Sequence, residues 1–427
     1  MILHLDLDCF FAAAHRIDNP SLDNIPIAVG GRSNLNIFEK DTQKRELSKI
    51  EGAFTSSILS VSDNSKSFEE YFVDIDKNGN RKIRGIITTS SYEARAFGVK
   101  TAMSVDEALR WCPSLIVLPP NYPLYHELSH KLKLLLEKEI PTIEQFSIDE
   151  FFGDITGWIK DEDALEFAYN LKQKILDELG LPISIGIAKT KWIAKLATND
   201  AKPNGVELIP PHRVDSYIKH KPIGSFCGIG KQYQARLKEK GITKLGQVKD
   251  KKELFYSWGK FGSQLYHRIL GTDDEKIALE KESSKSIGLG RTFDPLLDRY
   301  EIKRRLTILC RHLSFLAHKG KHNPMTFSLN VKYQYGTKVK DSINTQRDFT
   351  ELLFKKEIVK LFDKIDIHPS HSIVQVNITL SNFSENKIIT KNLFTQEDDE
   401  KQTKLTKSMQ KLRDKFGIDI IKSGGEL

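Results

Sequence analysis

The stretch IEQFSIDEFFGDIT, residues 143–156, decides the fold of the first half of the chain. Two apolar runs flank a Ser-Ile-Asp-Glu turn, a pattern that predicts a strand, a turn and a second strand. Asp149 and Glu150 stand at this turn, between flanks that contain three phenylalanines and an isoleucine. A solvated surface pair of acids, the ordinary explanation for Asp-Glu, does not need such apolar flanks. We therefore interpret the pair as functional carboxylates held at a strand end.

A third acid, Asp6, comes near the end of the first predicted strand, ILHLDL at residues 2–7. We expect it to lie near Asp149 and Glu150, because all three acids are placed near strand ends of one sheet. Carboxylates on rigid strands suit Mg²⁺, which prefers octahedral oxygen ligands. Two such ions roughly 3.5–4 Å apart can activate a 3′-hydroxyl and hold the triphosphate that it attacks. Asp8 is expected to have a structural role instead.

Length and composition bound the class of protein. A chain of 427 residues predicts two to four domains. The net charge of +8 favours an anionic partner without identifying one. The four cysteines form neither a metal-knuckle pair nor a disulfide framework, which favours a reducing compartment. The N-terminus lacks the pattern of a signal peptide, and no apolar run reaches about 18 residues, so we expect a cytoplasmic protein with no membrane partner.

The order of strand-like and helix-like segments along the chain predicts an α+β, multidomain fold. Strands and helices alternate over the first 210 residues, residues 212–280 are helical, and strands return between Lys285 and Ser381. Beyond the sequences already quoted, strands are expected at 25–31, 115–120 and 181–188, and helices at 92–111, 123–139, 161–179, 190–201 and beyond Gln396. Residues 32–67 have weak periodicity, so we interpret them as an inserted, mobile segment.

Residues 68–89 are predicted to form two β-runs around an Asn78-Gly79 turn. DIDKNGNRKIRG, residues 74–85, also matches the first positions of an EF-hand loop. Position 12 is Gly85, where a bidentate Glu is required, and no flanking helices are expected. We therefore interpret the segment as the tip of a hairpin.

Five motifs occur in order over roughly residues 1–310: HLDLDCFFAA (4–13), TTSSYEARAFGVKTAMSVDEA (88–108), SIDE (147–150), ISIGIAKTKWIAKLA (183–197) and AKPNG (201–205). Together they resemble the Y-family DNA polymerases, above all the bacterial polymerase IV (DinB) type. The resemblance implies a right-hand fold with a little finger. The expected parts are a palm (1–18 and 122–210), fingers (19–121, with an insertion at about 32–82), a thumb (211–282), a little finger (283–390) and a tail (391–427).

The resemblance also implies roles for single residues. Two Mg²⁺ ions, for which Mn²⁺ could substitute, would be held by Asp6, the Leu7 carbonyl, Asp149 and Glu150, with Glu150 beside the primer 3′-hydroxyl. Phe11 matches the steric gate that excludes the 2′-hydroxyl of ribonucleotides; without the motif it would be an ordinary core aromatic. The triphosphate grip is matched by Tyr92, Arg95 and Lys202, with Thr89 as a further candidate, since arginine can fork two phosphate oxygens.

Several segments are expected to hold DNA. Gly228, Gly230 and Lys231 resemble the turn of a helix-hairpin-helix, although an ordinary packing corner fits equally well. Lys285 and Arg291 open a segment that reaches Arg347 and contains 13 Lys/Arg against 4 Asp/Glu. Such an excess favours salt-dependent binding along the DNA backbone, against the alternative of a solvated basic face. In the tail, Leu393 and Phe394 resemble part of a sliding-clamp peptide, but the leading glutamine is missing.

The predicted activity is template-directed addition of dNTPs to a primer in translesion synthesis, with low fidelity and no proofreading exonuclease, by a monomer acting on primer-template DNA. Three alternatives remain open: another two-metal palm enzyme such as a nucleotidyl cyclase, a non-catalytic DNA-binding relative, and a partner-dependent mutagenesis subunit. A cyclase needs neither a helix-hairpin-helix nor a basic C-terminal module. Loss of the acids would mark the non-catalytic relative, and the YEARAFGVKTAMS run favours the polymerase IV branch over the mutagenesis subunit.

Overall fold

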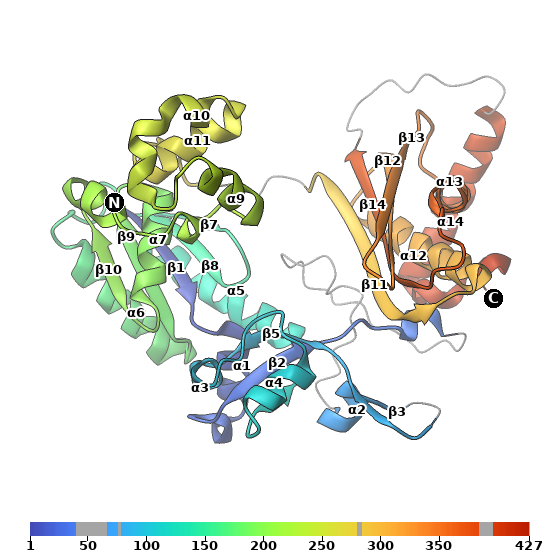
Figure 1. Cartoon of the computed structure of the whole chain (residues 1–427), viewed down its shortest axis with the longest axis horizontal. Helices are drawn as coiled ribbons and strands as arrows, with labels where there is room; N and C mark the ends of the chain where they lie inside the picture. The colour runs from blue at the N-terminus through green and yellow to red at the C-terminus, as the bar shows by residue number, and fades with distance from the viewer. Residues whose placement is uncertain (40–65, 76–77, 280–283, 384–395, 427) are drawn as a thin grey trace. The chain divides into compact units, whose positions relative to one another are not determined.

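The computed structural model describes residues 1–39, 66–75, 78–279, 284–383 and 396–426 (Figure 1). The chain forms two compact units. The N-terminal unit comprises Met1–Gly31 and Ser62–Lys281, and the C-terminal unit comprises Arg32–Val61 and Glu282–Leu427. Within the described ranges, no helix combines the length and the apolarity that crossing a bilayer requires.

The N-terminal unit is built on a five-stranded sheet of order β10-β9-β1-β8-β7. The strands are β1 (Ile2–Leu7), β7 (Thr142–Gln145), β8 (Glu150–Asp154), β9 (Ile183–Ala188) and β10 (Val206–Ile209). β1 lies in the middle, antiparallel to both β8 and β9. The predicted strand-turn-strand unit at 143–156 is confirmed as β7 and β8, whereas β10 was not predicted.

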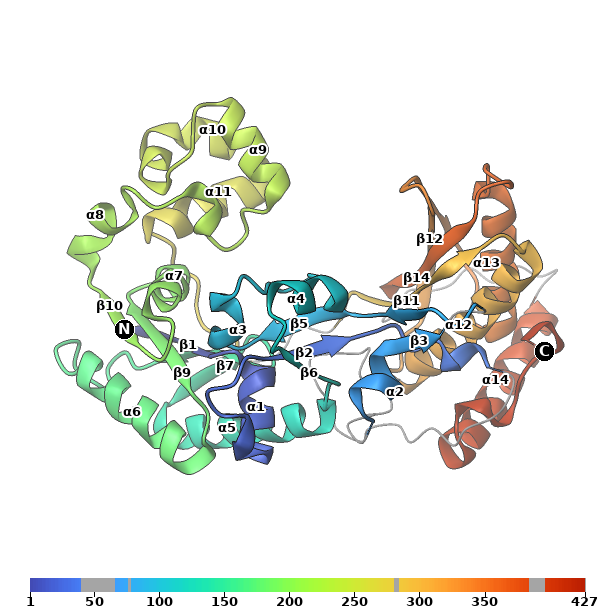
Figure 2. The same cartoon turned by 60° about the horizontal axis from the view of Figure 1, so that its bottom comes forward.

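Helices cover both faces of this sheet (Figure 2). α5 (Tyr122–Glu139) and α6 (Ala164–Leu179) lie on one side, and α7 (Lys191–Ala201) lies on the other. Side chains alternate along β1, so Leu3, Leu5 and Leu7 join the core beneath α5 and α6. The even-numbered residues, including Asp6, therefore point to the α7 side of the sheet.

A second, three-stranded sheet has the order β5-β2-β6. Its strands are β2 (Ile27–Gly31), β5 (Ile86–Ser90) and β6 (Ile116–Leu118), and the nearby helices are α1 (Phe10–Asp18), α3 (Tyr92–Ala96) and α4 (Val105–Trp111). The single helix expected at 92–111 is wrong. Gly98 and Ala102 adopt positive φ angles of 92° and 70°, which an α-helix cannot contain, so the segment divides into α3 and α4.

The segment at 68–89 also differs in part from its prediction. Residues Phe68–Phe72 form a short helix, α2, which begins at a capping box made by Ser67 and Glu70. The expected hairpin follows as β3 (Val73–Ile75) and β4 (Arg81–Ile83), which pair antiparallel. A helix therefore precedes the EF-like stretch, contrary to expectation.

The rest of the N-terminal unit is helical, as predicted. Its helices are α8 (Val214–Ile218), α9 (Lys231–Glu239), α10 (Lys252–Tyr256) and α11 (Gly259–Leu270). Gly230 is the N-cap of α9, and Gly228 has a φ of 93°. The element before these glycines is a 3-10 turn, Ile223–Ser225, so the expected helix-hairpin-helix lacks a full first α-helix.

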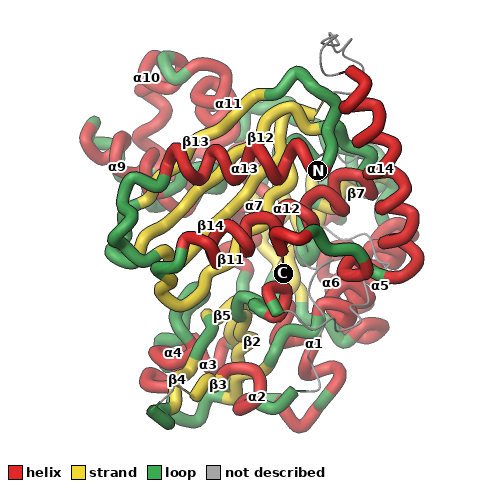
Figure 3. The backbone as a smooth tube through the Cα atoms, turned by 90° about the vertical axis from the view of Figure 1, so that its right-hand side faces the viewer, coloured by secondary structure: helices red, strands yellow, loops and turns green. Residues whose placement is uncertain are grey.

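The C-terminal unit is a four-stranded antiparallel sheet of order β11-β14-β12-β13. Its strands are β11 (Ser286–Leu296), β12 (Pro324–Tyr333), β13 (Lys338–Asn344) and β14 (Ile373–Phe383), and its helices are α12 (Arg299–Lys319), α13 (Glu351–Ile365) and α14 (Gln396–Phe416). α12 and α13 lie across one face of the sheet (Figure 3). The buried side chains of the strands and these two helices form one hydrophobic core.

Part of the predicted insertion belongs to this core. Ile37 and Phe38 are buried in it, at 2% and 5% exposure. The guanidinium of Arg305 lies over the Phe38 ring at 4.8 Å, and Arg304 Nη2 donates to the Phe38 carbonyl at 2.8 Å. The prediction of a mobile segment is therefore wrong for residues 32–39, and its remainder up to residue 65 lies outside the described residues.

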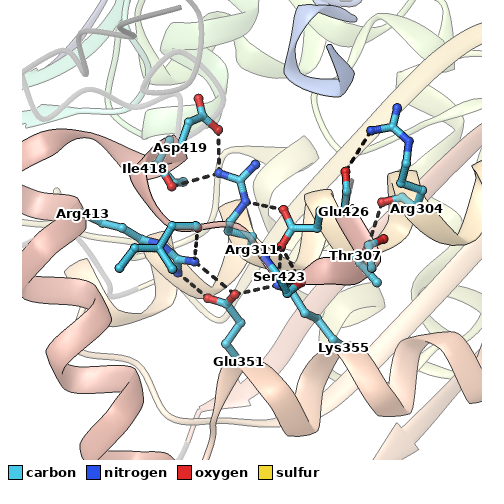
Figure 4. Close-up of polar contacts among 12 residues, drawn as sticks. Arg304, Thr307, Arg311, Glu351, Lys355, Arg413, Ile418, Asp419, Ser423 and Glu426 are labelled. Carbon is cyan, nitrogen blue, oxygen red and sulfur yellow. Dashed lines mark hydrogen bonds and ion pairs between the residues drawn. The ribbon is translucent and has the colours of Figure 1, made fainter. Parts of the chain in front are cut away.

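The chain after residue 395 adds a buried network of ion pairs to the C-terminal unit (Figure 4). Glu426 is fully buried and pairs with Arg311 and Lys355, each at 2.6 Å. Arg311 also pairs with Asp419 at 2.6 Å, while Glu351 pairs with both Lys355 and Arg413. Because each charge is desolvated, each one depends on its partners to remain stable. The network therefore makes α14 and the segment after it part of the folded unit.

We predict that Glu426→Gln strongly destabilises the C-terminal unit, because Arg311 and Lys355 would then lose a buried counter-charge. Breaking a buried pair costs about 3–5 kcal/mol, which corresponds to a melting temperature lower by roughly 6–20 °C for a unit of this size. Differential scanning calorimetry of the full chain measures the shift. Lys364→Met removes a more exposed ion pair, between α13 and Asp341, and should shift melting very little. Equal shifts for both variants would contradict the assignment.

Candidate active site

Strand register brings the predicted acids together. Asp6 on β1 is the direct partner of Glu150 on β8 and of Ser184 on β9. Side chains that face each other across an antiparallel pair lie about 4.5–5.5 Å apart at Cβ, on the same face. Asp149 precedes β8, and its carbonyl accepts a hydrogen bond from the Leu7 backbone N–H at 3.0 Å. The structure thus brings Asp6, Leu7, Asp149 and Glu150 to one end of the neighbouring strands β1 and β8.

Two lysines from the neighbouring α7 region neutralise these acids. Lys202 Nζ donates to Asp6 Oδ1 at 2.5 Å, and Lys195 Nζ donates to Glu150 Oε1 at 2.6 Å. Asp149 is held differently, because the Ser147 hydroxyl donates to its Oδ1 at 2.5 Å. The acids are therefore paired one by one rather than with each other.

Burial dominates the electrostatics of this site. It raises the pKa of Asp6, with further increases from Glu150 and Asp149, and the ion pair with Lys202 only partly offsets the effect. Burial, followed by the charge of Glu150, raises the pKa of Asp149 as well. On the same face of β1, burial and then the Lys195, Lys202 and Lys191 ammoniums hold the pKa of His4 well below its ordinary value. Burial therefore disfavours the charged forms of Asp6, Asp149 and His4 alike.

The chemistry of the donor set fits divalent metal ions. Three carboxylates and a backbone carbonyl are hard oxygen donors of the type that Mg²⁺ prefers. The raised pKa values of Asp6 and Asp149 favour a nearby positive charge, which a bound cation would supply. Among the described residues, no three His, Cys, Asp or Glu side chains are gathered into a group that could hold a metal ion. The lysine ammoniums at Asp6 and Glu150 contact carboxylate oxygens for which a bound cation would compete.

The loop after α7 positions Lys202. A Cβ at Gly205 would lie 2.2 Å from the Ala201 carbonyl oxygen, so only glycine permits this tight turn. The Asn204 N–H donates to Asp8 Oδ2 at 2.7 Å, which fastens the loop to β1's end. Asp8 also accepts from the Ser184 and Tyr92 hydroxyls, at 2.8 and 3.1 Å. These contacts agree with the expected structural role of Asp8.

Phe11 lies in the first turn of α1, half-buried against α5. Its ring stacks on Tyr125 with the centroids 4.2 Å apart and an interplanar angle of 12°. Tyr122 meets it edge-on at 6.4 Å. The ring is therefore fixed by aromatic contacts on one side, and its orientation does not depend on a ligand.

The candidates for the triphosphate grip lie around the start of α3. The Arg95 guanidinium sits 4.8 Å from the centre of the Tyr92 ring, and its Nε donates to the Ser90 carbonyl at 3.1 Å. Thr89 is half-buried on β5. Burial raises the pKa of the Cys9 thiol to about 11, while the charges of Arg95 and Lys202 both lower it. Tyr92 and Lys202 contact Asp8 and Asp6 respectively, so these groups lie near the junction of β1 and α1.

In the C-terminal unit, the sheet face opposite α12 and α13 carries hydroxyls, amides and lysines. Strand register arranges them in four rows across β11, β14, β12 and β13. The rows are Ser286-Ser381-Thr326-Asn344, Gly288-Thr379-Ser328-Ser342, Gly290-Asn377-Asn330-Lys340 and Thr292-Gln375-Lys332-Lys338. No carboxylate occurs in these rows, because Asp341 points to the other face and pairs with Lys364.

The predicted DNA contacts fall in different places. Lys231 is exposed at the first position of α9, and Lys285 is exposed just before β11. Arg291 lies opposite the buried Val376, on the helix-covered side of the sheet, where its Nε donates to the Asn34 carbonyl at 3.0 Å. It is therefore not part of the open face. Leu393 and Phe394 lie outside the described residues.

Sequence reasoning missed the residues that support the acids. Lys195, His4 and Ser147 were not singled out, although Lys195 lies seven residues before Lys202 and His4 precedes Asp6 on the same face of a predicted strand. That period-2 spacing could have identified His4. The rows of hydroxyls and amides were also visible as alternate residues of the predicted strands, but their alignment required the register.

Comparison with known proteins places the chain in a family. Residues 5–199 match the impB/mucB/samB family, and residues 284–393 match the C-terminal domain of that family. The two matches together cover more than half of the chain. Both candidate regions described above, the acids on the first sheet and the four-stranded sheet, fall within them.

Individual relatives and solved structures agree with this family match. DNA polymerase IV of Photorhabdus laumondii is 33% identical over 369 residues, which is 85% of this chain and 90% of that protein. DNA polymerase IV of Pasteurella multocida is 30% identical over 342 residues, covering 79% and 82%. Among solved structures, a Y-family DNA polymerase chimera of Dbh and Dpo4 matches with a TM-score of 0.68 at 23% identity, covering 90% of this chain and 99% of that one. An insertion ternary complex of Dbh DNA polymerase matches with a TM-score of 0.54 over the same shares. The expected α+β right-hand fold with a little finger is thus confirmed, and the chain belongs to the Y family of DNA polymerases, the low-fidelity enzymes of translesion synthesis.

Proposed function

We propose that this DNA-directed DNA polymerase extends a primer beside the ends of β1 and β8 in the five-stranded sheet, with Asp6, Asp149 and Glu150 as its catalytic acids. The observation that carries the proposal is the register of β1 and β8, which sets Asp6 directly opposite Glu150. The substrates would be primer-template DNA and dNTPs. In the cyclase alternative the basic C-terminal sheet would have no role, and in a non-catalytic relative the paired acids would have none.

Two Mg²⁺ ions, or Mn²⁺ in their place, would be held by Asp6, Asp149, Glu150 and the Leu7 carbonyl. When bound, such ions lower the barrier to attack by a 3′-hydroxyl and neutralise charge on the triphosphate. The protein's own work is positioning. β1 and β8 hold Asp6 and Glu150 on one rigid face, and Ser147 orients Asp149. Rigid positioning of this kind supplies much of the catalysis in phosphoryl transfer, which requires little covalent chemistry.

The nucleotide would lie between the acids and α3. Lys202, Arg95 and Tyr92, with Thr89 nearby, would bind the triphosphate, since ammonium, guanidinium and hydroxyl groups all donate to phosphate oxygens. Phe11, fixed against Tyr125, would lie under the deoxyribose and leave no room for a 2′-hydroxyl. The support for this arrangement is a set of contacts near Phe11: Lys202 pairs with Asp6, the Tyr92 hydroxyl donates to Asp8, and Arg95 lies over the Tyr92 ring.

The open face of the C-terminal sheet would follow the DNA backbone. Its hydroxyls, amides and lysines can bind phosphates without reading bases, and the four paired rows that carry them contain no carboxylate. The exposed Lys231 and the backbone N–H groups at the start of α9 would add a phosphate contact. We further propose that the enzyme is a cytoplasmic monomer and that Leu393 and Phe394 contact the sliding clamp. Deletion of residues 392–394 followed by assays of clamp-stimulated synthesis tests the last point.

Asp149→Ala should reduce the rate of nucleotide addition by about 10²–10³-fold or more, because a preorganised charge at the reacting centre is lost. Primer-template affinity should stay within about threefold, since the acid makes no DNA contact in this proposal. Single-turnover primer extension and fluorescence anisotropy measure the two quantities. Asp154→Ala, at the opposite end of β8, is the matched control. Near-normal extension by Asp149→Ala would end the proposal for these acids.

Phe11→Ala should raise ribonucleotide incorporation relative to deoxyribonucleotide incorporation by roughly 10–200-fold, the range that steric pocket contacts supply. The ratio of kcat/KM for each rNTP and dNTP pair measures this selectivity. Phe97→Ala removes an exposed phenylalanine beyond α3 and should leave the ratio unchanged. If sugar selectivity survived the loss of the Phe11 ring, that ring would be a core aromatic and nothing more.

Replacing Lys332, Lys338 and Lys340 together by Gln should weaken primer-template binding and reduce its salt dependence. Each phosphate contact contributes about 0.9 to the slope of log K against log salt, so the slope should become shallower by about 2–3. Anisotropy titrations between low and moderate salt give the slope. The control replaces Lys356, Lys360 and Lys364, three exposed lysines of α13 on the covered side, and changes the net charge equally. Identical slopes for the two triple variants would refute the assignment of this face.

A further inference from the structure

Lys195 contacts the carboxylate of Glu150 and has no role in the function proposed above. It is on α7, and its side chain is 14% exposed, while that of Glu150 is 20% exposed. Its Nζ lies 2.6 Å from Glu150 Oε1 and 3.4 Å from His4 Nε2, and it faces the Phe146 ring at 5.4 Å. A long, flexible side chain is thus held at three points, beside the acid expected at the primer terminus.

The hydrogen bonds behind Lys195 have one consistent direction. A lysine ammonium only donates, so His4 Nε2 must be the acceptor of its bond with Lys195. The proton of the His4 ring then lies on Nδ1, which donates to Thr198 Oγ1 at 2.8 Å. The Thr198 hydroxyl in turn donates within its own helix, to the Ala194 carbonyl at 3.0 Å, or to the His4 carbonyl at 3.1 Å. The chain of donors therefore ends on the backbone, and each side chain in it is oriented.

We propose that Lys195 is a positioning residue for Glu150, held in place by the neutral imidazole of His4. The inference rests on the proposed function of Glu150. The ammonium fixes one carboxylate oxygen toward α7, so the other oxygen can face the reacting 3′-hydroxyl without rotation of the side chain. Glu150 is the first residue of β8, and its backbone is held by Ser147 Oγ at its N–H and by the Phe146 and Ser147 N–H groups at its carbonyl. These bonds restrain the backbone, whereas Lys195 restrains the carboxylate. Lys195 itself does not touch the substrate.

Lys195→Met should lower kcat by about 10–100-fold, since small misplacements of a reacting group have effects of this size. The KM for dNTP and the Kd for primer-template should stay within about twofold, because neither ligand contacts Lys195 in the proposal. Lys195→Arg retains the charge and should recover most of the rate. His4→Phe keeps the ring beside Phe152 but loses the acceptor, and should lower kcat to a smaller extent. Lys174→Met, which breaks the exposed pair with Glu139, is the matched control.

A spectroscopic readout tests the geometry without activity. In the metal-free chain, the ¹⁵Nζ signal of Lys195, assigned by its loss in Lys195→Arg, should shift in Glu150→Gln and in His4→Phe. A signal that moves in neither variant would overturn the proposal, whatever the kinetics show. This measurement remains informative if Lys195→Met does not fold, as judged by circular dichroism.

Three kinetic results would also overturn it: a kcat for Lys195→Met within twofold of the parent chain, an unchanged kcat with a higher Kd for primer-template, or an equal loss in Lys174→Met. The second result would assign Lys195 to a DNA phosphate instead. Failure of the proposed function is distinguishable, since the unmodified chain would then not extend primers or Asp149→Ala would still do so. The Lys195 proposal fails alone when the parent is active and Asp149-dependent.

Discussion

The antiparallel pairing of β1 between β8 and β9 is the constraint on which the rest of the site depends. It places Asp6 opposite Glu150 on one side and Ser184 on the other. A slip of one residue would turn Asp6 into the core beneath α5 and α6, and Leu5 or Leu7 to the α7 side. Burial of Leu3, Leu5 and Leu7 opposes that slip, so the apolar half of β1 fixes the position of its acid.

Charge balance is the second organising feature of this site. Acids on β1 and β8 are too buried to be solvated by water alone, and lysines of the α7 region approach each of them separately. The same lysines can serve different purposes once substrates bind: Lys202 is on a loop that glycine and Asp8 shape, whereas Lys195 is within a helix and held by His4. A lysine on a constrained loop is placed to contact a ligand, whereas a lysine within a helix is placed to contact a neighbouring side chain.

The C-terminal unit separates a polar sheet face from a covered side that holds its hydrophobic core and its buried ion pairs. The paired rows on its open sheet face carry hydroxyls, amides and lysines, whereas its covered side collects segments from three parts of the chain. Ile37 and Phe38 enter the hydrophobic core, and Glu426 enters a network of buried ion pairs. Arg304 on α12 joins two of these segments, since it donates to the carbonyls of both Phe38 and Glu426. The paired rows of the open face are therefore free of core residues.

Local periodicity and ordered motifs can be recognised without knowing any contacts, so the sequence predicted the strand-turn-strand unit around Asp149, the helical segment after residue 210, the family and the residues worth testing. It misplaced what depends on distant partners. The helix expected at 92–111 divides at two positive φ angles, residues 32–39 pack into a core built some 250 residues later, and Arg291 faces the covered side of its sheet. The contacts of Lys195 with Glu150 and with His4 became visible in the folded chain alone. Strand register and helix packing join residues far apart in the chain, and no local pattern records which of them will meet.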